Sequence, residues 1–456
     1  MEEFIEKFRN GTHYMEIVSA VTEKELTTSN DITEEYVEQK CVKFIPASGA
    51  ATRMFKDLYT FLDDEKETAF IDQFFDQLEH FAFYEDIKEF VETNKLDKYT
   101  TEGRLKIADC VVKSKLAYGH LPKALIKMHT YNDGATTPID EHIFEGEQYL
   151  NQDSFNMHFT IAEEHEELFN QYVDQVLQGK EHIDITYSFQ KKETDTPAVD
   201  MNNQPFYLDN GEVFYRPGGH GALLENLNDL DADIIFIKNI DNVCHRSQVE
   251  DTIESKKALA SVGLNVQKQI NAYIADILSN EYHLADIEQF IKDILNITLK
   301  TALTKDKALE FLNRPLRVCG MVRNNGEAGG GPFVVDNGDY LDLQICEKAE
   351  IDLADEEKRA IFESSGYFNP VDIVCFVKDY KDEKFDLRDY TNEDRYFISE
   401  KTYQGKEIKA LEHPGLWNGA MHNWNTLFME VPLSTFNPVK TVNDLLREGH
   451  REVLSL

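Results

Sequence analysis

The sequence predicts an α/β fold with a mostly parallel sheet and helical insertions. The first observation is a set of short β-rich runs at Phe155–Ile161, Ile183–Phe189 and Asp233–Asn239, of which the second alternates with period two. The second is that helical segments, at 163–177 and 222–230, alternate with such runs. This alternation is typical of a parallel sheet with helices on both faces. The third is that two longer stretches with helical spacing of apolar residues interrupt the pattern.

The order of these elements suggests five segments along the chain. We expect a helical segment at 1–40, an α/β core at 41–246 with a helical insertion at about 55–118, a second helical insertion at 247–312, a further part of the core at 313–435, and a C-terminal helix at 436–456. Aromatic residues at helical spacing in the first insertion, such as Phe70 and Phe74, predict a packed core rather than a ligand site.

Composition and charge narrow the classes of function. The 456 residues are 41% hydrophobic and 29% charged, as in globular proteins that are soluble in water. With 84 acidic against 47 basic residues, the formal net charge is -37. Because this field repels polyanions, we expect no nucleic-acid and no membrane partner. An anionic small substrate would need a few well-placed Arg and Lys side chains, and an adaptation to high salt is an alternative reading of the acidity.

Cysteine usage and the N-terminal segment predict a cytoplasmic protein. The six cysteines are scattered without a CxxC pair or metal-type spacing, so we expect reduced, buried thiols. The first residues are acidic and amphipathic, unlike a signal peptide. No apolar run approaches the roughly 20 residues that span a bilayer. The oligomeric state is not predicted.

A small-residue turn follows the β-rich run Cys41–Pro46. The turn consists of Ala47, Ser48, Gly49, Ala50 and Ala51. Small residues let backbone N–H groups approach a phosphate, as in an anion-binding nest. Arg53 adds a cation whose fork suits phosphate oxygens. The turn matches neither the P-loop nor the GxGxxG pattern. By itself this turn is an ordinary one after a strand, and a phosphate site is the less favoured interpretation.

The segment Ile45–Met54 resembles the L-x-[AG]-G-x-G-T-R-[LM] signature of sugar-1-phosphate nucleotidyltransferases, in which a Pro-Lys pair follows later. Pro122-Lys123 supplies that pair after a long insertion. The resemblance implies that the loop from Ala47 to Thr52 wraps a nucleoside triphosphate, that Arg53 neutralises developing charge, and that Lys123 contacts phosphate. The sequence departs from the signature at Ala51, where the family has its second glycine.

A second glycine-rich turn comes before a candidate metal ligand. Gly218, Gly219 and Gly221 surround His220, and Asp241 follows the buried run at 233–239. Ligands of open α/β sheets bind at the carboxyl ends of strands, and Mg²⁺ prefers carboxylates there. The order resembles UDP-N-acetylglucosamine and UDP-glucose pyrophosphorylases, which implies that the glycines line the nucleotide and Asp241 binds Mg²⁺. A helix cap or turn is the alternative for Asp241.

Two weaker motifs complete the resemblance. The segments Arg317–Val322 and Leu343–Lys348 are similar to the family's Y-G-V-V run and its later Glu-Lys pair. They imply the following roles: Gly320 and Glu347 for sugar binding, and Lys348 for the sugar phosphate. The intervening Asn325–Phe333 is too glycine-rich for a strand and is either a mobile flap or a long hairpin.

The turn at 415–425 ends in Asn425, which by the same resemblance is a second metal ligand, with Asn423 and Asn418 as substitutes. The alternative is a turn packed on its own aromatic residues. Gln190, at the end of its predicted strand, is a candidate for reading a pyrimidine base.

Together the motifs imply a glycosyltransferase-A-like (nucleotide-diphospho-sugar transferase) fold and a Mg²⁺-dependent reaction. Its partners are a nucleoside triphosphate, with UTP favoured, and a sugar-1-phosphate. The chain is identified as a member of an uncharacterised bacterial family of unknown function within this superfamily. A protein that binds nucleotide or nucleotide-sugar without turnover is the alternative. A glycosyltransferase fits less well, because Asp241-Asn-Val is not an Asp-x-Asp motif.

Overall fold

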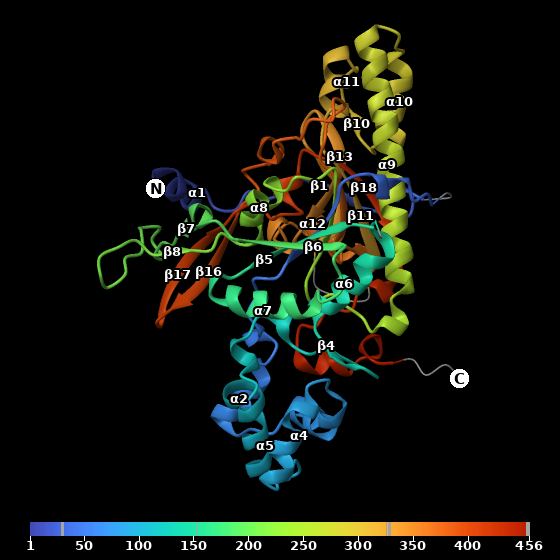
Figure 1. Ribbon diagram of the computed structural model, residues 1–456. Coiled ribbons are helices and arrows are strands. Elements are labelled where there is room, and N and C mark those ends of the chain that lie inside the picture. Colours follow the sequence, from blue (N-terminus) through green and yellow to red (C-terminus); the bar gives the residue numbers. More distant parts are fainter. Residues whose placement is uncertain (29–31, 152, 325, 327–329, 453–456) are drawn as a thin grey trace. The chain divides into compact units, whose positions relative to one another are not determined.

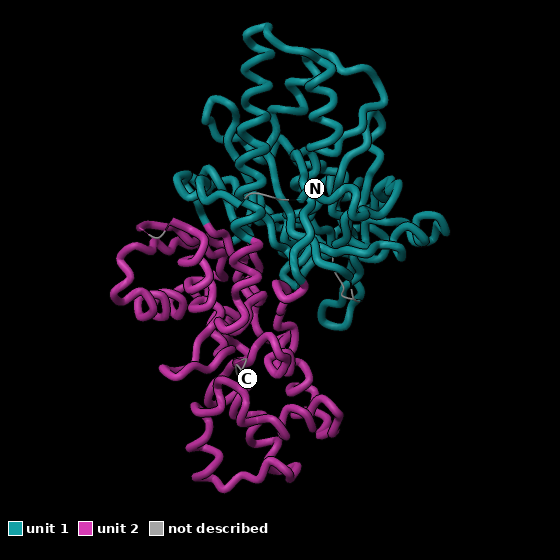
Figure 2. The backbone as a smooth tube through the Cα atoms, turned by 90° about the vertical axis from the view of Figure 1, so that its right-hand side faces the viewer, with its two compact units in different colours: residues 1–42, 190–237, 256–432 teal, residues 43–189, 238–255, 433–456 magenta. Residues whose placement is uncertain are grey.

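The computed structural model describes residues 1–28, 32–151, 153–324, 326 and 330–452. The chain divides into two compact units, each assembled from separate segments (Figure 2). Unit 1 contains residues 1–42, 190–237 and 256–432, and unit 2 contains residues 43–189, 238–255 and 433–456. The candidate site residues are therefore distributed over both units.

Unit 2 is built on strands that run in the order β2–β5–β6. These are β2 (Cys41–Pro46), β5 (Phe155–Ile161) and β6 (Ile183–Phe189), with the helices α6 (Pro138–Tyr149) and α7 (Glu166–Val176). β5 and β6 pair in parallel along their whole length. β2 is buried through its first five residues, as expected for a central strand covered on both faces. The strands and the helix expected between 155 and 189 are confirmed.

Residues after the loop form a helical insertion with its own hydrophobic core. Its helices are α2 (Lys56–Asp64), α3 (Ala69–Asp76), α4 (Tyr84–Thr93) and α5 (Thr101–Asp109). As expected, aromatic side chains form this core, and Phe74 packs edge-on against Phe75 with ring centroids 5.1 Å apart. After it come two short strands, β3 (His129–Tyr131) and β4 (Gly134–Thr136), which pair as a hairpin.

The end of the chain corrects one expectation. Residues expected to form a C-terminal α-helix form two short 3₁₀ helices, at Val442–Leu446 and Glu448–His450. The first places Leu445 and Leu446 in the core of the insertion. The extended backbone of Arg447, with φ -71° and ψ 157°, ends that helix before an α-helix can propagate.

Unit 1 contains strands in the order β14–β11–β15–β9, with β18 beside β11. They are β14 (Tyr367–Phe368), β11 (Leu316–Arg323), β15 (Asp372–Phe376), β9 (Ile234–Lys238) and β18 (Asn425–Glu430). β11 pairs antiparallel with β14 and β15 and parallel with β18. The α/β class with a central sheet is thus confirmed, with strand pairs of both orientations.

A second, antiparallel sheet in unit 1 corrects two further expectations. Its strands are β1 (Ile17–Ala20), β12 (Gly331–Asp336), β13 (Tyr340–Cys346) and β10 (Thr298–Leu299). The segment 1–40, expected to be helical, has the helix α1 (Glu2–Asn10) but also contributes β1. Residues 331–333, expected to be too flexible for a strand, belong to β12, because pairing with β13 satisfies their backbone. The rest of that glycine-rich run falls largely outside the described residues.

The remaining elements of unit 1 are helices and hairpins (Figure 1). They are the helices α8 (Leu224–Asn228), α9 (Glu250–Ser279), α10 (Leu284–Asp293), α11 (Lys305–Leu312) and α12 (Glu356–Glu363), and the paired strands β7 (Thr196–Pro197) with β8 (Tyr215–Arg216) and β16 (Phe397–Tyr403) with β17 (Lys406–Glu412). Among the described residues, no helix combines the length and apolar character needed to cross a membrane. All six cysteines are free and buried, as expected.

Candidate functional site

The small-residue loop of unit 2 lies against the Pro-Lys segment. The amide of Ala51 donates to the carbonyl of Leu121 at 3.0 Å, and the amide of Lys123 donates to the carbonyl of Gly49 at 3.2 Å. Ala50 and Pro122 form the bridge between these two bonds. The two ends of the helical insertion therefore lie side by side. The proximity that the sequence motif requires is present despite the insertion.

The loop offers exposed donors to a ligand. Gly49 and Ala50 are exposed and Ser48 is half-buried. Within the described part of the chain, the amides of these three residues donate to no acceptor. A Cβ added at Gly49 would meet no atom within 4 Å, so the space beside it is open. Backbone N–H groups that have no acceptor in a described residue suit an anion such as a phosphate.

Two polar side chains of the same loop differ in their interactions with the rest of the protein. Thr52 donates its hydroxyl hydrogen to the carbonyl of Gly119 at 3.0 Å, which ties the loop to the end of the insertion. Arg53 is exposed and forms no ion pair with any residue that the structure describes. The guanidinium is therefore available to a ligand that reaches the loop.

Ala51, the residue that departs from the family signature, has a structural explanation. Its side chain is fully buried and belongs to the core of the insertion, together with Met54 and Phe55. The methyl group thus points into that core and away from the exposed amides. A methyl placed there does not obstruct an anion at the loop.

Lys123 and Asp241, predicted separately as a phosphate contact and a metal ligand, are partners. The ammonium nitrogen of Lys123 lies 2.8 Å from Oδ2 of Asp241 and donates to the carbonyl of Val439, also at 2.8 Å. The side chains are 16% and 20% exposed, so the pair is largely but not fully withdrawn from water. The C-terminal segment also binds Asp241 directly, because the amide of Val439 donates to its carbonyl at 3.1 Å.

The donor set around Asp241 restricts how a metal could be held. Among the described residues, no group of three or more His, Cys, Asp and Glu side chains has the arrangement of a metal site. Mg²⁺ commonly takes one or two carboxylates and completes its shell with water and substrate phosphates. A single carboxylate fits Mg²⁺ that arrives with a triphosphate, and does not fit a permanent, all-protein metal site.

Asn425, the predicted second metal ligand, belongs to unit 1. It is fully buried on β18, and its amide donates to the carbonyl of Phe311 at the end of α11, at 2.9 Å. Its Oδ1 is buried and accepts no hydrogen bond from a described residue. The side chain therefore fastens α11 to the sheet, and its role toward a metal stays a prediction.

The glycine-rich turn of unit 1 packs against the segment 413–416. A Cβ at Gly221 would lie 2.0 Å from the carbonyl oxygen of Pro414, and one at Gly218 would lie 2.4 Å from the ring of His413. Gly219 has φ 78°, a region that favours glycine. The protein's own packing therefore requires all three glycines. Their contact with a nucleotide stays a prediction.

His220 and Glu347 bring two predicted parts of the site together within unit 1. The ring of His220 stacks on Trp417 with centroids 4.4 Å apart, and its Nε2 lies 3.4 Å from Oε1 of Glu347. Asn418 donates to the same carboxylate oxygen at 2.9 Å. Burial acts to raise the pKa of Glu347, but the hydrogen bonds from His220 and Asn418 outweigh it and lower that pKa. The side chain of Glu347 is thus a partly exposed carboxylate that can accept hydrogen bonds from hydroxyl groups.

The scaffold behind Glu347 is a buried ionic network that sequence reasoning missed. Arg395 donates from Nε to Oε1 of Glu350 at 2.7 Å and from Nη1 to Oε1 of Gln344 at 2.9 Å. Oε2 of Glu350 in turn accepts the amide of Glu347 at 2.8 Å. The spacing Glu347-x-x-Glu350 is that of a capping box and was a usable signal, whereas no local pattern marks Arg395.

The other predicted residues are found as follows. Gln190 directly follows β6 and is half-buried. Gly320 is buried in β11, where a Cβ would lie 3.2 Å from Val431, so packing accounts for this glycine. Lys348 is exposed and forms no ion pair with a described residue. For these three residues, the ligand roles stay predictions.

A family model covers almost the whole chain. The model of DUF4301, a domain of unknown function, matches residues 1–451. The chain belongs to this family. The expectation of an uncharacterised family is thereby confirmed. No curated protein sequence matches the chain.

Solved structures similar to this chain include UDP-glucose pyrophosphorylases, the class of enzyme that the motifs resemble. The enzyme from Leishmania major is 14% identical with a TM-score of 0.47, over 98% of this chain and 73% of that one. The corresponding UDP-glucose phosphorylase from Trypanosoma brucei is 15% identical with a TM-score of 0.48, over 100% and 77%. A variant of the Leishmania major enzyme, described in complex with UDP-glucose, is 14% identical with a TM-score of 0.47 over 98% and 73%.

Proposed function

We propose that this chain is a Mg²⁺-dependent nucleotidyltransferase with a glycosyltransferase-A-like fold. It joins a nucleoside triphosphate and a sugar-1-phosphate into a nucleotide-sugar and pyrophosphate. A phosphate oxygen of the sugar-1-phosphate attacks the α-phosphorus, and the bond from that phosphorus to the β-phosphate oxygen breaks. UTP is favoured because the motifs resemble those of uridylyl enzymes. We place the reaction in the cytoplasm, in keeping with six free cysteines.

The observation that carries the proposal is the joining of the loop at 46–54 with Lys123 and Asp241. Such a reaction needs no covalent intermediate with the protein. Its rate depends on the alignment of the two substrates and on stabilisation of the charge that develops on the phosphates. The amides of Ser48, Gly49 and Ala50 and the guanidinium of Arg53 are free to bind phosphate oxygens. They supply the donors and the positive charge that a triphosphate needs in a protein of strongly negative net charge.

The ion pair of Lys123 with Asp241 competes with the roles that both residues have in this proposal. In the pair, the ammonium is neutralised by the carboxylate at 2.8 Å. We propose that an entering triphosphate draws the ammonium of Lys123 onto its phosphate oxygens, which frees Asp241. Mg²⁺ held by Asp241 and the phosphates would supply charge neutralisation at the reacting phosphate.

The sugar is assigned to unit 1. Glu347 presents a carboxylate held in place by Asn418 and by the buried network of Arg395 and Glu350. A preoriented carboxylate suits sugar hydroxyl groups, which donate hydrogen bonds to it. Lys348 directly follows Glu347 in the sequence and is exposed. Its ammonium group is our candidate for binding the phosphate of the sugar-1-phosphate.

The test is pyrophosphate release with a panel of nucleoside triphosphates and sugar-1-phosphates in the presence of Mg²⁺. Asp241→Asn should abolish turnover. Asp86→Asn is the matched control, because Asp86 forms a comparable pair with Lys127 at 2.7 Å within unit 2 and neither residue has a role in the proposed site. Absence of turnover across the panel, together with absence of any thermal shift by a triphosphate, would contradict the proposal.

A nucleotide-binding protein without turnover is the second candidate. The observation that favours it is the closed pair itself, because Lys123 and Asp241 satisfy each other and the C-terminal segment binds both. Such a protein would be stabilised thermally by UTP or UDP-glucose and would release no pyrophosphate. The two assays together therefore separate the two candidates.

A further inference from the structure

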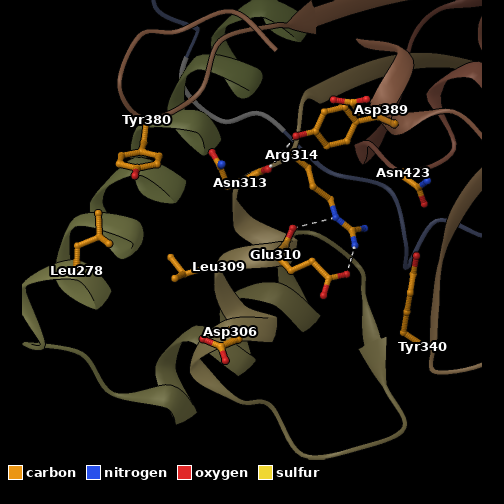
Figure 3. Close-up of a pocket in the computed structure, with 11 residues that line it drawn as sticks. Leu278, Asp306, Leu309, Glu310, Asn313, Arg314, Tyr340, Tyr380, Asp389 and Asn423 are labelled. Atoms are coloured by element: carbon orange, nitrogen blue, oxygen red, sulfur yellow. Dashed lines mark hydrogen bonds and ion pairs between the residues drawn. The ribbon is translucent and has the colours of Figure 1, made fainter. Parts of the chain in front are cut away.

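Unit 1 contains a pocket that shares only Asn423 with the site motifs. Its volume is about 600 Å³, and it lies between α11, the end of α9 and the turns around 380, 390 and 423 (Figure 3). The lining residues are Leu278, Asp306, Leu309, Glu310, Asn313, Arg314, Tyr340, Tyr380, Asp389, Tyr390 and Asn423. The size is that of pockets that hold small organic molecules.

Aromatic rings are concentrated in this pocket. Three of the 20 tyrosines of the chain, Tyr340, Tyr380 and Tyr390, line it. Figure 3 shows Tyr380 and Tyr340 on opposite sides, with Glu310 between them. Leu278 and Leu309 add apolar surface. The rings and the two leucines together suit a ligand with an aliphatic frame.

The charges of the lining exclude an anionic ligand. Three carboxylates line the pocket against one guanidinium, that of Arg314. This guanidinium is already engaged, because it donates to the carbonyl of Glu310 at 3.0 Å and to its Oε1 at 3.2 Å. Asp306 and Asp389 are exposed and form no ion pair with a described residue. A phosphate would therefore meet three carboxylates of the lining and one guanidinium that is already paired.

Two of the tyrosine rings already form cation–π contacts with side chains of the protein. The guanidinium carbon of Arg314 lies 5.8 Å from the centroid of Tyr340, and Nζ of Lys381 lies 5.4 Å from that of Tyr380. A cation over an aromatic face within about 6 Å is attracted by the ring quadrupole. The lysines of α11 do not fill the pocket's acidic positions, because Lys305 binds Asn280 at 2.9 Å and Lys307 lies 3.8 Å from Asp339.

We propose that this pocket binds an aliphatic amine with two or more ammonium groups, a ligand of the polyamine class. The tyrosine rings and the leucines contact the methylene chain and the cationic groups, and Asp306 and Asp389 neutralise the ammonium charges. The site is independent of the nucleotide site, so a failure of either proposal leaves the other in place.

The test is calorimetric titration of the full chain with spermidine, with 1,8-octanediol as a neutral probe of similar shape. Spermidine should bind and octanediol should not, and added salt should weaken binding because it screens the charges. The double variant Asp306→Asn/Asp389→Asn should lose at least about five-fold in affinity, the scale of exposed ion pairs. Lys381→Gln should bind more tightly, because it removes a competing cation beside Tyr380.

The matched control is Glu400→Gln/Glu407→Gln, which changes the net charge equally at two exposed positions of the β16–β17 hairpin. It should bind spermidine as the unchanged protein does. Equal losses in the two double variants would mean that spermidine responds only to net charge, and would overturn the proposal. Absence of binding, or equal binding of octanediol or of a neutral sugar, would overturn it as well.

Discussion

Ala51→Gly restores the glycine of the family signature and tests whether Ala51 is a core residue or a damaged loop residue. The side chain of Ala51 is 0% exposed and packs with Met54 and Phe55 in the core of the insertion. The substitution removes a buried methyl group and also loosens the backbone at the start of a 3₁₀ helix. Both effects destabilise unit 2.

The size of the loss follows from these two contributions. A buried methyl is worth about 0.8 kcal/mol, and glycine in place of alanine in a helix costs roughly 0.5–1 kcal/mol. We therefore expect Ala51→Gly to lower the free energy of unfolding of unit 2 by about 1.5 kcal/mol. Ala50→Gly is the control in the same loop, because Ala50 is exposed and only the backbone contribution applies.

The assay has to report on unit 2. The two tryptophans, Trp417 and Trp424, both belong to unit 1, so their fluorescence is unsuitable. Hydrogen exchange of peptides from 54–128 measures the opening free energy of the insertion. Ala51→Gly should lower it more than Ala50→Gly, with triphosphate affinity unchanged. An unchanged opening free energy, or a tenfold gain in triphosphate affinity, would refute the placement of the methyl in the core.

Three further predictions concern the remaining parts of the site. Arg395→Leu leaves Glu350 buried and unpaired, so it should cost about 3–5 kcal/mol in urea unfolding followed by tryptophan fluorescence; a loss below 1 kcal/mol would contradict the network. Gly221→Ala places a Cβ against a backbone carbonyl oxygen and should lower the melting temperature sharply, whereas Gly49→Ala meets open space and should change it little; similar melting temperatures would contradict the packing. The pKa of Glu347 is lowered from 4.5, so the stabilisation that its carboxylate contributes is present above that pH and is lost as the pH falls through its folded-state pKa. The difference in stability between the unchanged protein and Glu347→Gln, measured by thermal unfolding between pH 3 and 6, should therefore shrink toward the acid end. A constant difference would contradict the shift.

Local patterns were sufficient for several strands of the central sheet, whereas β14 and β15 were not predicted. The runs Phe155–Ile161 and Ile183–Phe189 are strands with the expected bounds, because β-rich composition in the first and period-two alternation in the second are local signals. Ile17–Ala20 was not predictable in this way, since its pairing with β12 depends on residues more than 300 positions away. The continuous helix expected at 436–456 is replaced by two short 3₁₀ helices, the first of which packs in the core of the insertion.

The candidate site was predictable only as far as its motifs reach. The motif placed Lys123 beside the loop, and the backbone pairing of Ala50 with Pro122 confirms that proximity. The ion pair of Lys123 with Asp241 was not predictable, because each residue was assigned a ligand of its own. Arg395 is likewise invisible in the sequence, since its partners come from β13, from the turn after it and from His422.

The most direct test of the central claim is pyrophosphate release by the unchanged protein and by Lys123→Gln, measured side by side with the active triphosphate and sugar-1-phosphate. Lys127→Gln is the control, because it removes the other lysine of the segment and its pair with Asp86. We expect a loss of about 10²–10³-fold for Lys123→Gln, the scale of removing one preorganised donor from a transition state, and little change for Lys127→Gln. Equal turnover in Lys123→Gln and the unchanged protein would contradict it.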